Sequence, residues 1–275
     1  MLDNEQPITM SSFYIVLLTL VLYLVATMLV ARRLKATDSL TSRKLIFITA
    51  SLAILLHTLV LGNMIVTIAG FNLSLFNSLS VCMVIIGFIT LVAFSLRPLD
   101  IMLMLVLPVS ASSLLLAWMF PSMHLLPLDS PTGLRIHVLI SIIAYSLMAL
   151  AALHAIFLWI QNRQLHNHHT GGIVRLLPPL QEMEKLLFEI ILVGFIFLSI
   201  ALSSGFIFLQ NLFEQHLVHK TILSILAWCL FAALLLGHWF MGWRGRVAVR
   251  WTIGGFICLM LAYIGSKFVL EFILG

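Results

Sequence analysis

Charged side chains are scarce in this sequence. Asp, Glu, Lys and Arg make up 9% of its 275 residues, whereas 62% are hydrophobic. A soluble domain carries about 25% charged residues, so this balance excludes a soluble globular protein. The chain also lacks low-complexity tracts and internal repeats, and we therefore expect one integral membrane domain over residues 1–275.

Polar residues rarely interrupt the long apolar segments of the sequence. A bilayer core about 30 Å thick takes roughly 20 apolar residues as a helix, against about 10 as a barrel strand. Only these two structures satisfy every backbone polar group inside lipid, and the runs here are too long for barrel strands. We predict an all-α, polytopic helical membrane protein with about eight transmembrane helices, at residues 11–31, 46–69, 76–96, 99–120, 134–160, 186–210, 220–241 and 248–272.

Positive charge is nearly absent from alternate loops. If the N-terminus lies outside, only Arg135, Lys220 and Lys267 of the 15 basic residues fall on the outer side. Because Lys and Arg collect in cytoplasmic loops, we predict that both termini lie outside. This topology explains the isoelectric point of about 9.4 without a nucleic acid partner. The inner residues are Arg32, Arg33, Lys35, Arg43, Lys44, Arg97, Arg163, Arg175, Lys185, Arg244, Arg246 and Arg250.

Several catalytic and redox motifs are missing. The cysteines Cys82, Cys229 and Cys258 lie in predicted spans without CxxC spacing, which favours a packing role. The spans contain no paired catalytic acids, no Gly-rich phosphate loop and no Ser-His-Asp arrangement, so we expect no enzyme.

Histidines, by contrast, are present in the spans. Four of the five ionisable residues there or at the span ends are His57, His137, His154 and His238, and the fifth is Glu189. Such groups are costly in a bilayer and usually mark functional sites, and imidazole suits proton relay, metal ligation or haem ligation. The other interpretation is that each histidine bonds a neighbouring helix and orients packing. His137 and His154 are 17 residues apart, about 25 Å along a helix, and cannot bind the same iron.

Further histidines lie in the loops. The outer loops 121–133 and 211–219 carry three that could approach His137 near the outer surface, namely His124, His216 and His219. The inner loop 161–185 holds a histidine cluster at residues 166–169. We interpret this cluster as a solvated linker, because nothing in the sequence supplies a second shell of metal contacts.

Three stretches of the C-terminal half resemble a known family. They read RIHVLISIIAYSLMALAAL at 135–153, LPPLQEMEKLLFEIILVGFIFLSIALSSG at 177–205 and HKTILSILAWCLFAALLLGHWFMGWRGRVAVRWTIGGFICLMLAYIGS at 219–266. In their order, and in the GWRGR connection at 242–246, they are similar to the CcsA-type cytochrome c assembly family, haem-handling membrane proteins related to the HemX-like group. The resemblance is to its YpjD-like branch of the bacterial inner membrane, and it implies a cytochrome c assembly-like core at about 76–272.

The resemblance implies haem as a cofactor and suggests residues that contact it. His137 falls on the family's outer haem-ligand histidine. A second ligand of the haem iron could be rebuilt opposite it from His219 or His216. Arg135 would then pair with a haem propionate; the other interpretation is an interfacial arginine whose guanidinium extends to the membrane surface. His238, two residues beyond the place of the family's intramembrane histidine, and His57 are further candidate contacts. The implied partners are the lipid bilayer and a cytochrome c assembly protein or another inner-membrane protein.

Three functions stay open at this point. The first is a haem-binding, haem-handling inner-membrane protein linked to cytochrome c assembly. The second is a cofactor-free membrane regulator or assembly partner, because the tryptophan-rich loop with which the family presents haem reads QNLFEQHLVHKT here, at 210–221. The third is a small-solute or proton-coupled transporter with His57, His154 and His238 as a relay, although the chain shows no inverted repeat.

Overall fold

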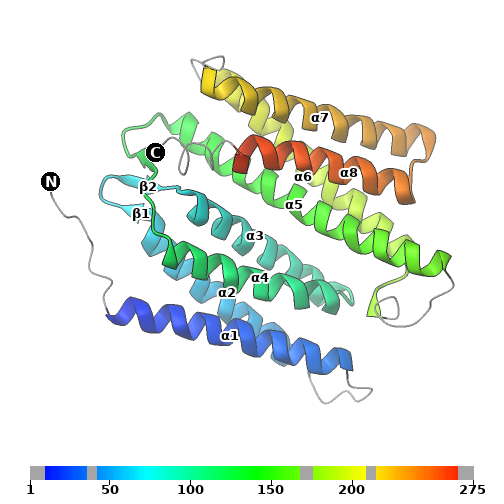
Figure 1. Ribbon diagram of the computed structural model, residues 1–275, viewed down its shortest axis with the longest axis horizontal. Helices are drawn as coiled ribbons and strands as arrows, with labels where there is room; N and C mark the ends of the chain where they lie inside the picture. The colour runs from blue at the N-terminus through cyan, green and yellow to red at the C-terminus, as the bar shows by residue number, and fades with distance from the viewer. Residues whose placement is uncertain (1–9, 36–41, 168–175, 209–214, 266–275) are drawn as a thin grey trace. The chain divides into compact units, whose positions relative to one another are not determined.

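The structure, a computed structural model, describes residues 10–35, 42–167, 176–208 and 215–265 and is dominated by helices (Figure 1). Within these ranges, eight helices are long and apolar enough to cross a membrane. The prediction of an all-α polytopic membrane protein is therefore confirmed. The helices are α1 (Met10–Lys35), α2 (Arg43–Ile65), α3 (Leu75–Leu96), α4 (Asp100–Met119), α5 (Thr132–His166), α6 (Leu180–Phe208), α7 (Gln215–Met241) and α8 (Gly245–Met260), which continues into a π-helical turn, η2 (Leu261–Gly265).

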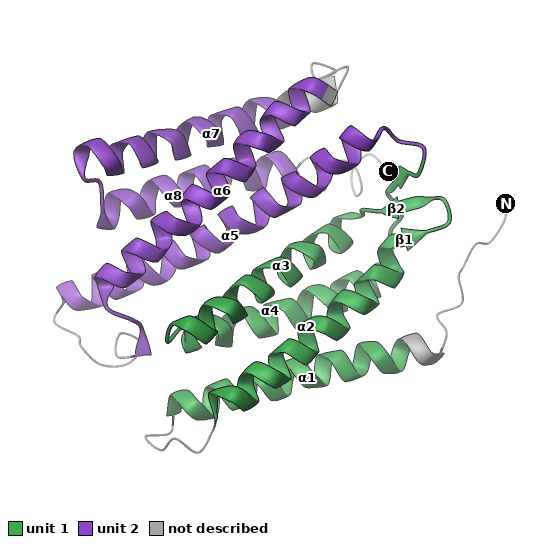
Figure 2. Cartoon of the chain, turned by 180° about the vertical axis from the view of Figure 1, so that it is seen from behind, with its two compact units in different colours: residues 1–128 green, residues 129–275 purple. Residues whose placement is uncertain are grey.

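The helices form two compact units, shown in different colours in Figure 2. Unit 1 comprises residues 1–128 with helices α1 to α4, and unit 2 comprises residues 129–275 with helices α5 to α8. The prediction of a single domain over 1–275 stays a prediction. Following the charge rule, we call the end of each unit that is richer in Lys and Arg the inner end, and the opposite end the outer end.

The connection between α5 and α6 differs in length from the prediction. Helix α5 continues past the predicted end at residue 160 to His166, because a helix does not have to stop where its apolar residues stop. Helix α6 begins at Leu180 instead of residue 186, directly after the Pro178–Pro179 pair. The Pro179 carbonyl accepts hydrogen bonds from the backbone N–H groups of Glu182 and Met183 at 2.9 and 3.1 Å. Proline is common at helix starts, where its missing N–H costs nothing.

A small antiparallel sheet covers the outer end of unit 1. Its strands, in spatial order, are β1 (Val66–Thr67), β2 (Gly70–Asn72) and β3 (Leu125–Pro127). The prediction that helix continues to residue 69 is therefore wrong from residue 66. The Thr67 hydroxyl closes the hairpin by donating to the Gly70 carbonyl at 2.6 Å.

Asn72 fastens this sheet to the loop that precedes β3. Its amide nitrogen Nδ2 donates to the Ser122 carbonyl at 3.0 Å, and its Oδ1 accepts from the His124 backbone N–H at 3.1 Å. The sheet thus joins the α2–α3 connection to the segment after α4. The sequence alone gives little sign of it, since strands of two or three residues show no usable periodicity.

Replacing Gly70 with alanine is expected to open this sheet. Gly70 has φ 148°, a conformation that L-residues rarely adopt, and a Cβ there would stand 2.2 Å from the Leu126 carbonyl oxygen. Relief requires β2 and β3 to part, at a cost of roughly 1–3 kcal/mol. Limited proteolysis should cleave the Gly70→Ala variant faster near residues 66–72. In the control Gly62→Ala, the new Cβ meets nothing within 4 Å, and equal cleavage of both variants would contradict the prediction.

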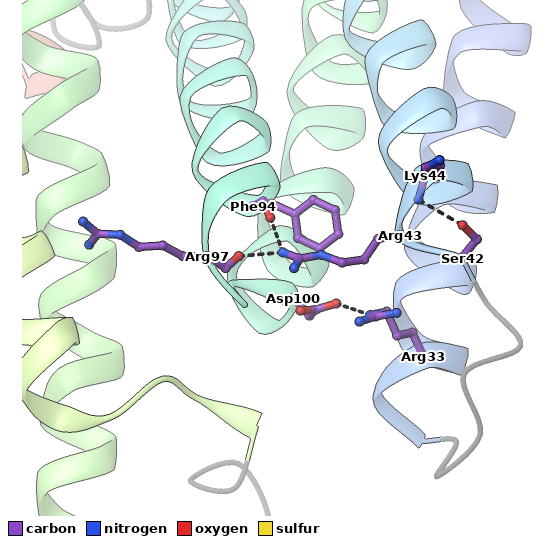
Figure 3. A network of polar contacts seen from close by, with 7 residues as sticks. All are labelled: Arg33, Ser42, Arg43, Lys44, Phe94, Arg97 and Asp100. Carbon is purple, nitrogen blue, oxygen red and sulfur yellow. Dashed lines mark hydrogen bonds and ion pairs between the residues drawn. The ribbon is translucent and has the colours of Figure 1, made fainter.

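Arginine side chains hold the inner end of unit 1 together (Figure 3). Arg33 of α1 donates from Nε to Asp100 Oδ1 at 2.8 Å, and Asp100 is the first residue of α4. Arg43 of α2 donates to the carbonyls of Phe94 and Arg97 at the end of α3, the latter at 2.7 Å. Its guanidinium also lies over the Phe94 ring, 4.6 Å from the centroid. Charge-assisted hydrogen bonds at this end thus link α1 to α4 and α2 to α3.

Candidate functional site

A cavity of about 250 Å³ lies at the outer end of unit 2. It is bounded by the start of α5, the end of α6, the start of α7, and the region where α8 passes into η2. Most of its lining surface is apolar, with hydroxyl groups, one imidazole and one ammonium among the described lining residues, which is typical of a ligand site. The described lining residues are Leu134, His137, Val138, Ser141, Ala144, Tyr145, Leu198, Ala201, Leu202, Gly205, Phe206, Lys220, Thr221, Ser224, Leu259, Ala262 and Tyr263.

His137 is half-buried and lines this cavity. Its Nδ1 lies 2.9 Å from the Ser204 hydroxyl oxygen. Ser204 already donates its hydroxyl hydrogen to the Ala201 carbonyl at 2.9 Å, so it accepts from the His137 Nδ1–H. This assignment leaves the unprotonated nitrogen of the neutral ring at Nε2. An imidazole held at one nitrogen, with a lone pair on the other, is the usual arrangement of a metal-binding histidine.

Gly205 allows α6 to pass close to the His137 ring. A Cβ at Gly205 would stand 3.2 Å from His137 Cε1 and 3.7 Å from Nδ1. Any larger residue would therefore press on the ring. The Ser204–Gly205 pair both bonds His137 and makes room for it, a role that the sequence interpretation missed.

Lys220 brings a positive charge to the cavity. It stands near the start of α7, and its ammonium lies 5.5 Å from the centroid of the Tyr263 ring. The ammonium is close enough to act electrostatically on the His137 ring. The sequence interpretation counted Lys220 only as one of the few outer charges and did not place it at the site. Its position, at the first residue of a predicted span, was the available signal.

Two residues that the sequence analysis suggested as haem contacts are not among the described lining residues of the cavity. Arg135 is outside the described lining of the cavity, and its Nη2 makes a long contact of 3.5 Å with the Thr132 hydroxyl of its own helix. Its Nε is buried without a hydrogen-bond partner among the described residues. The backbone of His219 belongs to α7, but its side chain lies outside the described part of the structure. Both assignments stay predictions.

His57 lies in unit 1, at the centre of a buried hydrogen-bond chain. The ring bonds the Tyr23 hydroxyl through Nδ1 at 2.9 Å and the Ser80 hydroxyl through Nε2 at 2.8 Å. Tyr23 also bonds Ser110, which donates to the Val106 carbonyl at 2.9 Å. Both nitrogens of His57 are therefore engaged, and the chain joins all four helices of unit 1.

The geometry of His154 matches the packing interpretation. It is fully buried in α5, and its Nε2 lies 2.9 Å from the Met183 carbonyl of α6. A hydrogen bond between neighbouring helices is the usual role of an isolated histidine in a membrane bundle. His154 does not belong to the described lining of the outer-end cavity.

His238 holds the GWRGR connection at the inner end of unit 2. Its Nδ1 donates to the Trp243 carbonyl at 2.9 Å, and its ring stacks on Phe188 with centroids 3.6 Å apart. Helix α7 ends at Met241, and Gly242, at φ 68°, donates its N–H to the His238 carbonyl at 3.2 Å, as in an αL C-cap. His238 lies 18 residues beyond Lys220, about 27 Å along α7. His238 and His137 therefore cannot share one iron.

The other loop histidines do not assemble a metal site in the described structure. His168 and His169 lie outside the described residues, and so does the side chain of His216. His124 belongs to unit 1, where its backbone bonds Asn72. Across the described ranges, no group of three or more His, Cys, Asp or Glu side chains could hold a metal ion.

Comparison of the sequence with known proteins shows which family the chain belongs to. The family described as "Cytochrome C assembly protein" matches residues 45–274, most of the chain. The chain belongs to the cytochrome c assembly family. The predicted resemblance is thereby confirmed. No solved structure matches the chain.

Three relatives illustrate the breadth of the cytochrome c assembly family. "Inner membrane protein YpjD" of Escherichia coli K12 is 34% identical over 239 residues, which cover 84% of this chain and 88% of the relative. A 28.8 kDa protein of Azospirillum brasilense is 32% identical over 144 residues, 51% of this chain and 52% of the relative. "Cytochrome c biogenesis protein CcsA" of Prochlorococcus marinus MIT 9515 is 25% identical over 171 residues, 54% of each chain. With its eight spans, the chain is a multi-pass inner-membrane protein, as predicted.

Proposed function

We propose that this member of the cytochrome c assembly family binds haem at the outer-end cavity of unit 2, where His137 would bind the haem iron. One observation carries the proposal: His137 lines the cavity while Ser204 holds its Nδ1, which leaves the Nε2 lone pair available to a ligand. A hydrogen bond to the second ring nitrogen fixes the orientation of a metal-binding imidazole.

The residues present fit a haem. A bound haem would supply an iron that accepts axial nitrogen ligands and two negatively charged propionates. The cavity offers an imidazole, an ammonium and an apolar wall. At about 250 Å³ the cavity is smaller than the roughly 300–1,000 Å³ of a typical small-molecule site and is partly open. A bound haem would therefore extend beyond the cavity, which is compatible with a protein that passes haem to another protein.

His219 is the proposed second ligand. Its backbone directly precedes Lys220, whose side chain lines the cavity, so the two histidines belong to the same end of unit 2. The proposed role is to hold haem rather than to catalyse a reaction. As part of an assembly family, the chain would then pass haem to a cytochrome c or to another assembly protein of the inner membrane.

The absorption spectrum of the wild-type protein tests this proposal. Protein expressed with excess haem and purified in detergent should show a Soret band and, after reduction, the sharp α-band of low-spin haem. Protein from haem-limited cells should acquire the same bands when titrated with haem. If both preparations stay colourless, haem binding is contradicted. The result would then favour a cofactor-free assembly partner. The lack of tryptophan in QNLFEQHLVHKT also supports this alternative.

A further inference from the structure

Among the described residues, the lining of the outer-end cavity carries a positive charge and no carboxylate to balance it. Among its described lining residues Lys220 is the one lysine or arginine, and none of them is an aspartate or glutamate. A charged side chain held in apolar surroundings is costly unless a group of opposite charge accompanies it. The cavity therefore favours a ligand that carries a negative charge.

The position of the Lys220 ammonium does not fit an outward-pointing lysine. Lysines at the ends of spans commonly extend along the helix and place the ammonium in the headgroup region. Here the ammonium lies 5.5 Å from the centroid of the Tyr263 ring, and Lys220, Tyr263 and His137 all line the cavity. Its charge is thus directed toward the cavity.

The remaining lining limits the kind of anion. Leu134, Val138, Leu198, Leu202 and Phe206 present an apolar wall from α5 and α6. A small hydrated anion would gain nothing from contact with this apolar wall. An amphipathic acid, with an apolar body against this wall and a carboxylate at Lys220, satisfies both parts of the cavity.

We propose that Lys220 binds a carboxylate of the ligand and makes the outer-end cavity selective for amphipathic acids over neutral molecules of the same shape. The inference rests on the proposed function and adds a specificity-determining residue to it. On the described geometry the carboxylate partner is Lys220 of α7, since Arg135 turns toward Thr132 on its own helix.

Metal-free porphyrins test this proposal without involving iron. Protoporphyrin IX and its dimethyl ester share one ring system, but only the former carries carboxylates. Binding of each to the detergent-purified full chain can be followed by porphyrin fluorescence anisotropy. Wild-type protein should bind the acid about tenfold more tightly than the ester. Lys220→Met should lose this preference, and Lys220→Arg should retain most of it.

Lys185→Met is the matched control. It removes the same charge from the same unit, but Lys185 lies at the inner end, where it pairs with Glu189. This variant should bind both porphyrins as the wild type does. Equal binding of acid and ester by the wild type, or a preference that survives in Lys220→Met, would overturn the inference. The wild-type comparison needs no variant to fold.

The two proposals fail in different ways. If haem gives a Soret band but porphyrin acid and ester bind equally, the haem site stands and the role of Lys220 falls. If the protein binds neither haem nor porphyrin, both proposals fall.

Discussion

Replacing His137 with alanine is expected to abolish the Soret band of haem-loaded protein. The substitution removes the cavity-lining imidazole whose Nδ1 is held by Ser204 and whose Nε2 carries the lone pair. Without His137, the proposed contacts of His219 and Lys220 would hold haem only weakly, because His137 is the one imidazole among the described lining residues. The spectra of wild type and variant, purified in parallel with excess haem, measure the effect.

Two further variants sharpen this test. Ser204→Ala keeps the imidazole but removes the group that orients it, so haem affinity should fall by roughly 10–100-fold while some Soret band remains. His154→Ala removes a buried histidine from the same helix, away from the described cavity lining, and should leave the spectrum unchanged. A full Soret band in His137→Ala, or its loss in a well-folded His154→Ala, would contradict the assignment of His137.

Replacing His57 with leucine is expected to lower the free energy of unfolding of unit 1 by roughly 2–4 kcal/mol. The His57 ring links two buried hydroxyls: the Tyr23 oxygen lies 2.9 Å from Nδ1 and the Ser80 oxygen lies 2.8 Å from Nε2, and Tyr23 also bonds Ser110. Leucine leaves two fully buried hydroxyls, those of Tyr23 and Ser80, with one partner fewer.

An apolar version of the chain separates lost hydrogen bonds from lost packing. The combined variant Tyr23→Phe, His57→Leu and Ser80→Ala removes the orphaned hydroxyls together with the ring, so it should be more stable than His57→Leu alone. Thermal unfolding in detergent, followed by circular dichroism, gives the comparison. If the three substitutions destabilise additively, the hydrogen-bond chain does not act as a unit. If His57→Leu unfolds like the wild type, the chain contributes nothing measurable.

The sequence predicts the helices well but not the contacts between them. Runs of about 20 apolar residues predict spans because length and hydropathy alone determine them. Such helices are apolar on nearly every face, so their periodicity does not reveal which side faces the bundle. The sequence therefore identified His137 through a resemblance but could not bring Ser204, Gly205 or Lys220 to it.

Short and irregular elements escaped prediction for another reason. The strands after residue 65 depend on a single glycine with positive φ and on hydrogen bonds from Asn72, and neither feature changes the hydropathy of the region. The contact between Arg135 and Thr132 likewise came only from the structure, because charge and position in the sequence do not give the direction of a side chain.

The arginine contacts at the inner end of unit 1 also have a consequence for how the protein is made. The ribosome synthesises Arg33 and Arg43 before Phe94, Arg97 and Asp100, so both arginines wait for their partners until α3 and α4 have entered the membrane. During that interval their charges can act as retention signals on the cytoplasmic side. Afterwards the same two guanidinium groups form hydrogen bonds with groups at the ends of α3 and α4. Biogenesis and final stability of this unit therefore depend on the same residues at successive times.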